Sequence, residues 1–522
     1  MADTKTTTTT PDTVSIKDSV LLDTQPSKAS SVTITTAEIK DPRLKDEMYD
    51  SKLEWTEKEE NEVRRILDIR LMPFILLMSF VLNMDRTNIS NAISDNLAED
   101  LGFNNDGVNL SILVYSIIFT IFTLPSNPIA KRIGAHLWIP ILMNSWAIVT
   151  WAHALIHDFD AFMAVRVLIA VTEAGFIPAC LTYLTGWYKT KELATRLAYF
   201  WGVQSFASAF SGLISFGVFR MAGIGGLEGW KWLFLLDGIL THIVGVIAFW
   251  YLPAKAGKTR GWFTERQAKI AATRIIRDDL SKTDQHARIT WDDVKEALLD
   301  TKIWTHLITT FIAMMPGTPI GTYLPSIIRD GGFSVTTANL LTIPSHIIGL
   351  VFSIIIAASS DRYGEVCLHA LIGVVWQAVG YAALWGMPVD ASRWSKFAAA
   401  TVTAAAPSWH GMHIAYMSAN LSPAGKRALA LGAIIGSANI CGVPGSQIYS
   451  ASDAPRYLRG NMICVVLNIV AAFLFLFQRF RYDLTNRWRN RKWNNMSEEQ
   501  KLHYLKTTKH KGSNRLDYRF RI

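Results

Sequence analysis

Residues 71–92, LMPFILLMSFVLNMDRTNISNA, decide the class of fold to which this 522-residue chain belongs. A helix needs about 20 mostly apolar residues to cross the hydrocarbon core of a bilayer, and this stretch has that length. It ends in a polar string in which an acid and a base, Asp85 and Arg86, stand side by side. Ionisable groups at membrane depth are costly and usually mark the path of a substrate or an ion. The stretch therefore predicts a membrane-spanning helix that carries a charged site.

Apolar stretches of similar length recur along the chain as far as Phe480, with short polar breaks between them. The chain is 50% hydrophobic and 18% charged, whereas soluble proteins carry about 25% charged residues. We therefore predict an all-α, polytopic membrane protein with twelve transmembrane helices. The predicted spans are Leu71–Ala92, Val108–Leu124, Trp138–Leu155, Ala161–Tyr188, Ala194–Val218, Lys231–Leu252, Ile303–Ile328, Ala338–Ala358, Cys367–Gly386, Phe397–Met417, Leu429–Tyr449 and Met462–Phe480.

The positions of the basic residues predict the orientation, because lysine and arginine collect in cytosolic loops. They follow the second span at Lys131 and Arg132 and the fourth span at Lys189. The loop after the first span, which includes Asp95 and Asp106, is acidic and has no lysine or arginine. Both termini and the central polar segment are thus predicted to be cytosolic. The net charge of +9 fits this topology, so we do not take it as a sign of nucleic-acid binding.

Two short patterns repeat along the chain at nearly the same spacing. Arg132-Ile133-Gly134 follows the second span, and Arg362-Tyr363-Gly364 follows the eighth, 230 residues later. Arg196-Leu197-Ala198 and Arg427-Ala428-Leu429 stand 231 residues apart. Such a repeat predicts two homologous six-helix halves with a substrate site between them, as in one known class of transporters. The predicted parts are a disordered cytosolic N-terminal tail (1–52), the first half (53–252), a cytosolic central loop (253–302), the second half (303–480) and a basic cytosolic tail (481–522).

Four charged residues of the first half are predicted to lie in the membrane: Asp85 and Arg86 in the first span, and Arg166 and Glu173 in the fourth. Arg166 and Glu173 are seven residues apart, which puts them on one helix face about 10 Å from each other. Arginine binds a carboxylate through two hydrogen bonds, and a carboxylate in a low-dielectric cavity is able to carry a proton. The alternative is that Asp85–Arg86 and Arg166–Glu173 are permanent ion pairs that brace the helices.

The second half offers weaker candidates for contact with a substrate. His410 interrupts an alanine-rich helix, and Asn439 lies between two glycines of the eleventh span. Pro316-Gly317 predicts a bend in the seventh span that directs Tyr323 toward the mouth of the cavity. His410 and Asn439, like Tyr115 of the second span, also have a simpler interpretation as packing residues. Asp237 in the sixth span is interpreted as structural and near the outer end of its helix.

Several strings of the sequence resemble those of the major facilitator superfamily. Asp361-Arg362-Tyr363-Gly364 keeps the core of its loop signature, Gly-x-x-x-Asp-Arg-x-Gly-Arg, although the first half has Lys131 in place of the acid. The strings Met84–Ile89, Glu173–Pro178 and Gly229–Phe234 are similar to those of its anion:cation symporter family, and more narrowly of the fungal allantoate permease group.

In bacterial carboxylate symporters of that family, the acid of the first span and the glutamate of the fourth are the proton sites. The resemblance thus implies proton coupling at Asp85 and Glu173, and substrate binding at Arg86, Arg166 and Tyr115. It also implies a conformational role for the loop motif and a multi-pass location in the plasma membrane, with another endomembrane as the alternative. The residues of the loop motif are Arg132, Gly134, Asp361, Arg362 and Gly364.

The predicted function is secondary active, proton-coupled uptake of a small organic anion by alternating access. The anion is a carboxylate such as nicotinate, pantothenate or allantoate, or a sulfonate. The alternatives are a non-transporting nutrient sensor on the same fold and an organic-anion exporter. We predict no enzyme activity, no cofactor and no metal, because the sequence has no phosphate-loop signature and no cysteine–histidine cluster with metal spacing. The expected partners are the anion, protons and the lipid bilayer, with the chain acting as a monomer and not binding nucleic acid.

Overall fold

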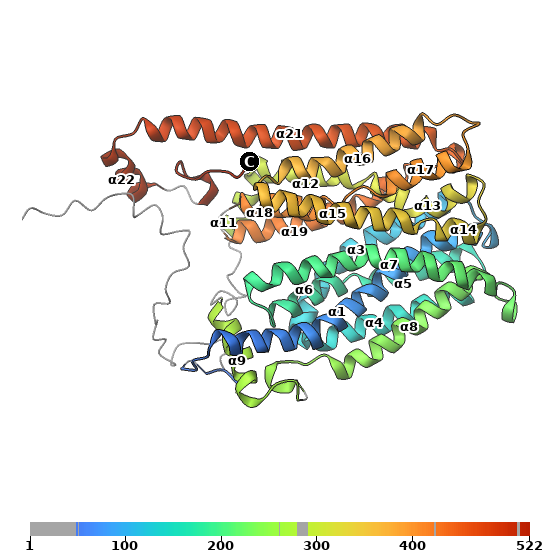
Figure 1. Cartoon of the computed structure of the whole chain (residues 1–522), viewed down its shortest axis with the longest axis horizontal. Helices are drawn as coiled ribbons and strands as arrows, with labels where there is room; N and C mark the ends of the chain where they lie inside the picture. The colour runs from blue at the N-terminus through green and yellow to red at the C-terminus, as the bar shows by residue number, and fades with distance from the viewer. Residues whose placement is uncertain (1–47, 51, 260, 279–290, 422–423, 509–511) are drawn as a thin grey trace, which may run out of the picture. The chain divides into compact units, whose positions relative to one another are not determined.

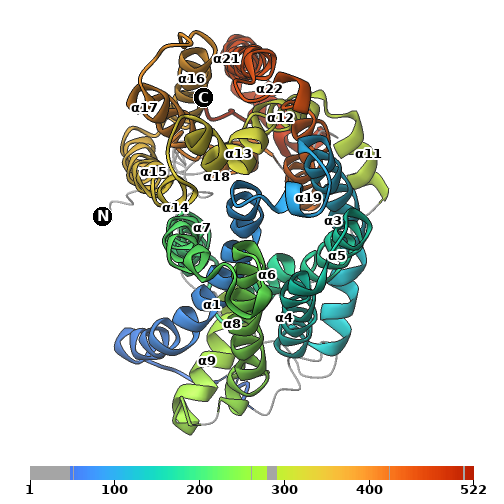
Figure 2. The same cartoon turned by 90° about the vertical axis from the view of Figure 1, so that its right-hand side faces the viewer.

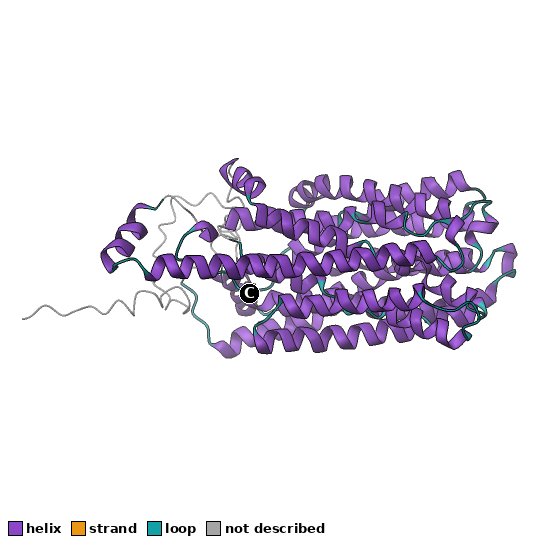
Figure 3. Ribbon diagram, turned by 90° about the horizontal axis from the view of Figure 1, so that it is seen from above, coloured by secondary structure: helices purple, strands orange, loops and turns teal. Residues whose placement is uncertain are grey.

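The computed structural model describes residues 48–50, 52–259, 261–278, 291–421, 424–508 and 512–522. The described residues form helices and loops and contain no strand, as Figure 3 shows. The helices of the first half are α1 (Glu57–Ser94), α2 (Leu97–Asp100), α3 (Asn105–Ile133), α4 (Ala135–Ala152), α5 (Phe159–Glu173), α6 (Phe176–Thr185), α7 (Thr190–Val218) and α8 (Gly229–Tyr251). In the described part of the predicted central loop, α9 (Glu265–Asp278) packs against α1.

The second half follows as a further series of helices. They are α11 (Trp291–Leu299), α12 (Thr301–Met314), α13 (Gly317–Asp330), α14 (Val335–Leu340), α15 (Ile343–Tyr363), α16 (Cys367–Trp385), α17 (Arg393–Ala404), α18 (His410–Ala419), α19 (Ala424–Ile440), α20 (Gly442–Ser446), α21 (Leu458–Asn494) and α22 (Glu498–Thr507). In Figure 1 the blue-to-green helices of the first half and the yellow-to-red helices of the second form two groups.

The predicted polytopic helical fold is confirmed. Nine helices in the described part of the chain are long and apolar enough to cross a membrane. Three further segments complete the twelve predicted spans: α4, which has 18 residues, and the broken pairs α12–α13 and α17–α18. The first pair breaks at Pro316, where proline has no N–H to donate to the preceding turn. The second pair breaks between Ala405 and Trp409, a stretch that includes Pro407.

The start of α1 explains how the charged site of the first span is held. The Thr56 side chain accepts a hydrogen bond from the backbone N–H of Glu59, and the Glu59 side chain accepts one from the backbone N–H of Thr56, which makes a capping box. From there α1 runs unbroken for 38 residues. Asp85, Asn88 and Asn91 recur every third residue and are buried, so the helix presents a polar stripe to its neighbours.

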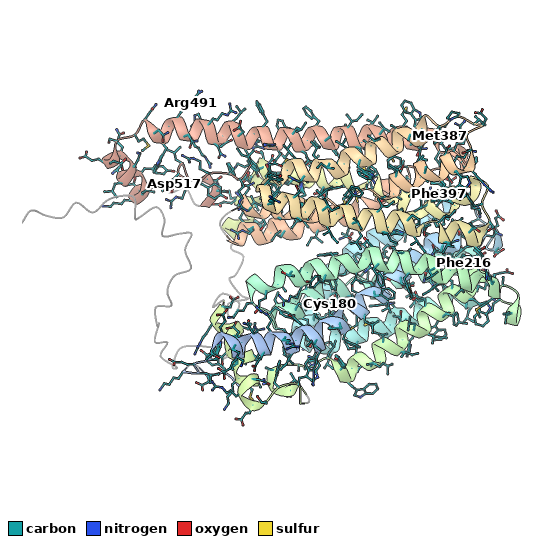
Figure 4. All side chains as sticks on the ribbon, in the orientation of Figure 1. Cys180, Phe216, Met387, Phe397, Arg491 and Asp517 are labelled. Atoms are coloured by element: carbon teal, nitrogen blue, oxygen red, sulfur yellow. The ribbon has the colours of Figure 1, made fainter. Side chains whose placement is uncertain are left out.

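The bundle has two ends, which we name by the charge of their loops. The acidic end carries the loop with Asp95 and Asp106, and the basic end carries Lys189, α9 and the last turns of α21. Figure 4 labels Phe216, Met387 and Phe397 at the acidic end, and Arg491 and Asp517 at the basic end. Figure 2 views the helices from the acidic end. The two groups of helices meet through α1 with α13, α7 with α14 and α15, and α3 with α19 and α20.

Part of the predicted basic tail is packed against the second half. α21 continues as a helix to Asn494, beyond the predicted end of the last span. The backbone N–H of Phe520 donates to Asn486 Oδ1 at 2.9 Å, and that of Arg521 donates to Asn420 Oδ1 at 2.7 Å. The ring of Phe520 stacks on Tyr482 with centroids 4.4 Å apart. Residues 512–522 therefore tie the end of α18 to α21.

Candidate functional site

Glu173 is the centre of a polar cluster in the first half. It is the last residue of α5 and is 1% exposed. Its Oε2 atom accepts a hydrogen bond from Arg86 Nε at 3.0 Å and another from the Tyr115 hydroxyl at 2.6 Å. A Cβ on Gly175, two residues later, would lie 1.7 Å from Ser126 Oγ. Glycine is therefore required for α3 to pack this closely against the break between α5 and α6.

Both arginines of the cluster lie over aromatic rings of α3. The guanidinium carbon of Arg166 is 4.9 Å from the centroid of the Tyr115 ring, and that of Arg86 is 5.1 Å from the centroid of Phe119. Such stacking attracts a cation without neutralising it. Arg166 is buried, with 8% of its surface exposed, and it makes no hydrogen bond and no ion pair with the described residues. Its guanidinium is thus a buried positive charge that lacks a counter-ion.

The ion pairing differs from both pairs that the sequence suggested. Arg86 pairs with Glu173, so neither Asp85–Arg86 nor Arg166–Glu173 is a pair in this structure. The reason is geometric, because neighbouring residues of a helix point about 100° apart. Arg86 faces α5 and α3, whereas Asp85 faces α4 and accepts a hydrogen bond from Thr150 Oγ1 at 3.0 Å.

Asp237 of α8 belongs to this region, and the sequence interpretation missed it. Its Oδ2 accepts a hydrogen bond from Asn88 Nδ2 at 2.7 Å, one helical turn from Asp85. It is 4% exposed, as is Asp85. The interpretation placed Asp237 near the outer end of its helix, but it lies at the depth of the charged site. The sequence does contain a signal for such a residue: the polar residues Asp85, Asn88 and Asn91 recur along one face of α1, which predicts polar side chains on the helix that packs against it.

The candidates of the second half occupy separate places. Tyr323 is 1% exposed and lies at the acidic end of the bundle, between the halves. His410 opens α18 beside Trp409, and its Nδ1 is buried without a hydrogen-bond partner. Asn439 is exposed and donates to the Ile435 carbonyl of its own helix at 2.9 Å. Their described hydrogen bonds connect none of the three to Glu173 or to either arginine of the cluster.

A further polar cluster, which lies in the second half, was not predicted from the sequence. His306 of α12 shares a hydrogen bond of 3.1 Å with His413 of α18 and one of 3.0 Å with the Tyr482 hydroxyl of α21. His306 and His413 are buried. Residues from three helices thus hydrogen-bond to one another, as polar groups in a packed bundle usually do, although His413 Nδ1 has no partner among the described residues.

The loop motif marks equivalent helix ends in the two halves. Gly134 ends α3 with a φ of 96°, and Gly364 ends α15 with a φ of 66°. This backbone region favours glycine. Arg132 and Arg362 precede these turns and are exposed. The side chain of Asp361 lies outside the described residues.

The halves are joined at the acidic end by hydrogen bonds around Tyr323. The Tyr323 hydroxyl donates to Asn109 Oδ1 at 2.7 Å, and Asn109 Nδ2 donates to the Tyr449 carbonyl at 2.5 Å. Asn105 Nδ2 donates to the Tyr457 hydroxyl at 2.7 Å. The rings of Tyr449 and Tyr457 are stacked, with centroids 4.2 Å apart.

Residues at the end of α1 extend this contact. Ser94 receives a hydrogen bond at its hydroxyl from Asn339 Nδ2 at 2.8 Å, and one at its carbonyl from Arg329 at 2.9 Å. Within the described part of the chain, every hydrogen bond between the halves involves residues 94–109 of the first half. We call this set of contacts the acidic-end seal.

Comparisons with known proteins agree with this architecture. The family model described as Major Facilitator Superfamily matches residues 75–446. The uncharacterized transporter YIL166C of Saccharomyces cerevisiae is 31% identical over 482 residues, which are 90% of this chain and 89% of that protein. The major facilitator-type transporter hxnP of Emericella nidulans is 31% identical over 448 residues, which are 83% and 87% of the two chains.

A solved structure shows the same fold. A bacterial homologue of the human lysosomal transporter Spinster, in an inward-facing and unoccupied conformation, superposes with a TM-score of 0.61 at 15% sequence identity. The match covers 81% of this chain and 98% of that chain.

Proposed function

Because the chain belongs to the Major Facilitator Superfamily, we propose that this multi-pass membrane transporter takes up a small organic anion together with protons, by alternating access. The observation that carries the proposal is Arg166, a buried guanidinium with no acidic partner among the described residues. The proposed substrate is a carboxylate such as nicotinate, pantothenate or allantoate, or a sulfonate. The resemblance to the anion:cation symporter family and its allantoate permease group supports this choice.

The charge of the site favours an anionic substrate. A buried charge without a partner is costly, and a carboxylate or sulfonate supplies two oxygens that fit the fork of a guanidinium. The Tyr115 ring beneath Arg166 restricts the guanidinium and leaves its edge for the ligand. Arg86 and the Tyr115 hydroxyl both donate to Glu173 Oε2, so Arg86 already has an acidic partner.

The shared position of Glu173 supports proton coupling. While it is ionised, Glu173 holds Arg86 and repels an approaching anion. Protonation of Glu173 removes that repulsion and releases Arg86 to the substrate. Proton and anion then bind with positive cooperativity, and the coupling is reciprocal. Asp85 adds a further carboxyl group behind Arg86 on the same helix.

The acidic-end seal supports a direction of access. With the halves joined at that end, the substrate reaches the site from the basic end, which we propose faces the cytosol. The Spinster homologue, whose fold is similar, was solved in an inward-facing conformation. We further propose that the protein works as a monomer in the plasma membrane, where release at the cytosolic side makes it an importer.

We expect Tyr323→Phe to weaken the seal without disturbing the fold. It removes the hydroxyl that donates to Asn109, and one neutral hydrogen bond contributes about 1 kcal/mol, or about a fivefold shift between two states. Ala338 is 0% exposed in α14, beside the seal. In the Ala338→Cys background, labelling by a membrane-impermeant maleimide from outside should therefore become about five times faster. Tyr381→Phe, which removes a buried hydroxyl bonded to Pro316 within the second half, is the matched control. Equal labelling rates with and without Tyr323→Phe would show that this bond does not hold the seal.

The orientation is tested by two glycosylation tags. We expect a tag inserted at Lys282, which lies in the central segment outside the described residues, to remain unmodified. A tag inserted at Gly102, in the acidic loop before α3, should be glycosylated. The reverse pattern would overturn the orientation, while leaving the site and its chemistry in place.

The proposed function is tested by uptake of a labelled panel in cells that lack the gene. The panel contains nicotinate, pantothenate, allantoate, biotin and a sulfonate, and uptake is compared with and without the restored gene. Gene-dependent uptake of one anion supports the proposal. Faster loss of a preloaded anion would favour the exporter, and no flux of any panel member together with altered nutrient signalling would favour the sensor.

A further inference from the structure

We propose that Asp85 of α1 and Asp237 of α8 form a second proton-binding site, a carboxyl pair that shares one proton in this conformation. The site is distinct from Glu173, although its use in transport rests on the proposed function. The pair lies on the side of α1 that faces α4 and α8, whereas Glu173 lies on the side that faces α3 and α5.

The hydrogen bonds of the pair leave one oxygen of each carboxyl group free. Asp85 Oδ2 accepts from Thr150 at 3.0 Å, and Asp237 Oδ2 accepts from Asn88 at 2.7 Å. The Oδ1 atoms of both residues are buried and have no hydrogen-bond partner among the described residues. Both carboxyl groups lie where α1, α4 and α8 meet. Asn88, which donates to Asp237, is one helical turn from Asp85, and a Cβ on Gly238 would lie 2.5 Å from the backbone nitrogen of Trp151, the residue after Thr150. One proton between them would supply the hydrogen bond that both groups lack.

Asn88 is held so that it donates to Asp237. Its Oδ1 accepts a hydrogen bond from the Ser211 hydroxyl at 2.9 Å, and Ser211 in turn accepts one from Asn91 Nδ2 at 2.7 Å. This chain fixes the Asn88 amide with its NH₂ group toward α8. The Oδ2 atom of Asp237 is therefore occupied as an acceptor, and Oδ1 is the atom available for a proton.

The arginines near the pair do not compensate two carboxylates. Arg86 of α1 is paired with Glu173 of α5, and Arg166 of α5 lies over Tyr115 of α3.

The remaining titratable neighbour is His153. Its Nδ1 is bonded to the Val149 and Thr150 carbonyls, and its ring stacks on Phe234 of α8. Neither Asp85 nor Asp237 makes an ion pair within the described residues. Like charges this close and this buried are stabilised when they share a proton.

Asp85 also links the pair to the coupling site. The next residue of α1, Arg86, donates to Glu173. The three acids thus lie around one stretch of α1, between α8 and α5.

The test is infrared difference spectroscopy of the purified full chain without substrate, at neutral pH. A shared proton gives the carbonyl-stretch band of a protonated carboxyl group, and we expect both Asp85→Asn and Asp237→Asn to abolish it. Asp68→Asn is the control, because Asp68 is paired with Arg196 and should contribute no such band. Both test substitutions keep the size of the side chain, and each variant must elute and melt as the wild type does.

Retention of the band in both variants would overturn the proposal. Loss in only one of them would also overturn it, because the proton would then belong to a single carboxyl group. The spectrum needs neither substrate nor transport, so its outcome is separate from the proposed function. If uptake is coupled to protons but the carboxyl band is absent, only this inference is contradicted. If the band is present but uptake is not coupled to protons, only the proposed function is contradicted.

Discussion

Arg166→Ala is expected to abolish uptake of the transported anion while the protein still reaches its membrane. Arg166 is the buried guanidinium without an acidic partner in the described part of the chain. Truncating one side of a buried charged contact costs about 3 kcal/mol or more, which corresponds to a loss of about 100-fold or more in affinity. The measurement is labelled-anion uptake, normalised to the amount of protein at the cell surface.

Two further variants sharpen this test. Arg166→Lys should restore little uptake, because an ammonium group is a point charge and cannot replace the planar fork of a guanidinium. Arg220→Ala is the matched control, because Arg220 also lies over an aromatic ring, that of Phe216 at 4.4 Å, but outside the site. Uptake like that of the wild type in Arg166→Ala would contradict an anion site at this residue.

Glu173→Gln is expected to abolish accumulation against a gradient and to spare exchange. Glutamine imitates the protonated form permanently, so it no longer holds Arg86 by charge and no longer carries a proton through the cycle. Substrate then still moves down its gradient and exchanges across the membrane, with a flattened dependence on pH. Reconstituted vesicles allow pH-gradient-driven uptake and counterflow exchange to be measured side by side.

The control for this variant is another buried acid. Glu192 is 9% exposed and pairs with Arg274 at the basic end, away from the site, so Glu192→Gln should keep coupled uptake. Asp85→Asn should also impair uptake, because Asp85 directly precedes Arg86, the partner of Glu173. If Glu173→Gln still concentrates the substrate, the coupling proton binds elsewhere, and His410 becomes the next residue to test.

The number and order of the helices are accessible from the sequence because membrane spans depend on local composition. The run that ends at Asp85-Arg86 has bilayer length, and the structure continues it as the single helix α1. The equivalence of Gly134 and Gly364 is also local, because each must end a helix in a backbone conformation that favours glycine. Such features need no knowledge of the neighbouring helices.

The contacts within the site join residues that are far apart in the sequence, so they could not be predicted from local composition. The sequence shows that Arg86 follows Asp85, but the rotation of α1 decides that Arg86 reaches Glu173 while Asp85 faces Thr150. Asp237 is 149 residues from Asn88, so only the packing of α8 on α1 reveals its place. The hydrogen bond of Tyr323 to Asn109 belongs to one conformation of a moving protein, and a sequence does not specify which conformation is populated.

The central claim, proton-coupled transport of an organic anion, is tested most directly in vesicles that contain the purified wild-type chain. The measurement is the internal concentration of the labelled anion identified from the panel, with and without an imposed pH gradient. We predict accumulation above the external concentration only while the gradient lasts, and a return to equal concentrations when a protonophore collapses it. Accumulation that is unaffected by the gradient and by the protonophore would contradict the claim.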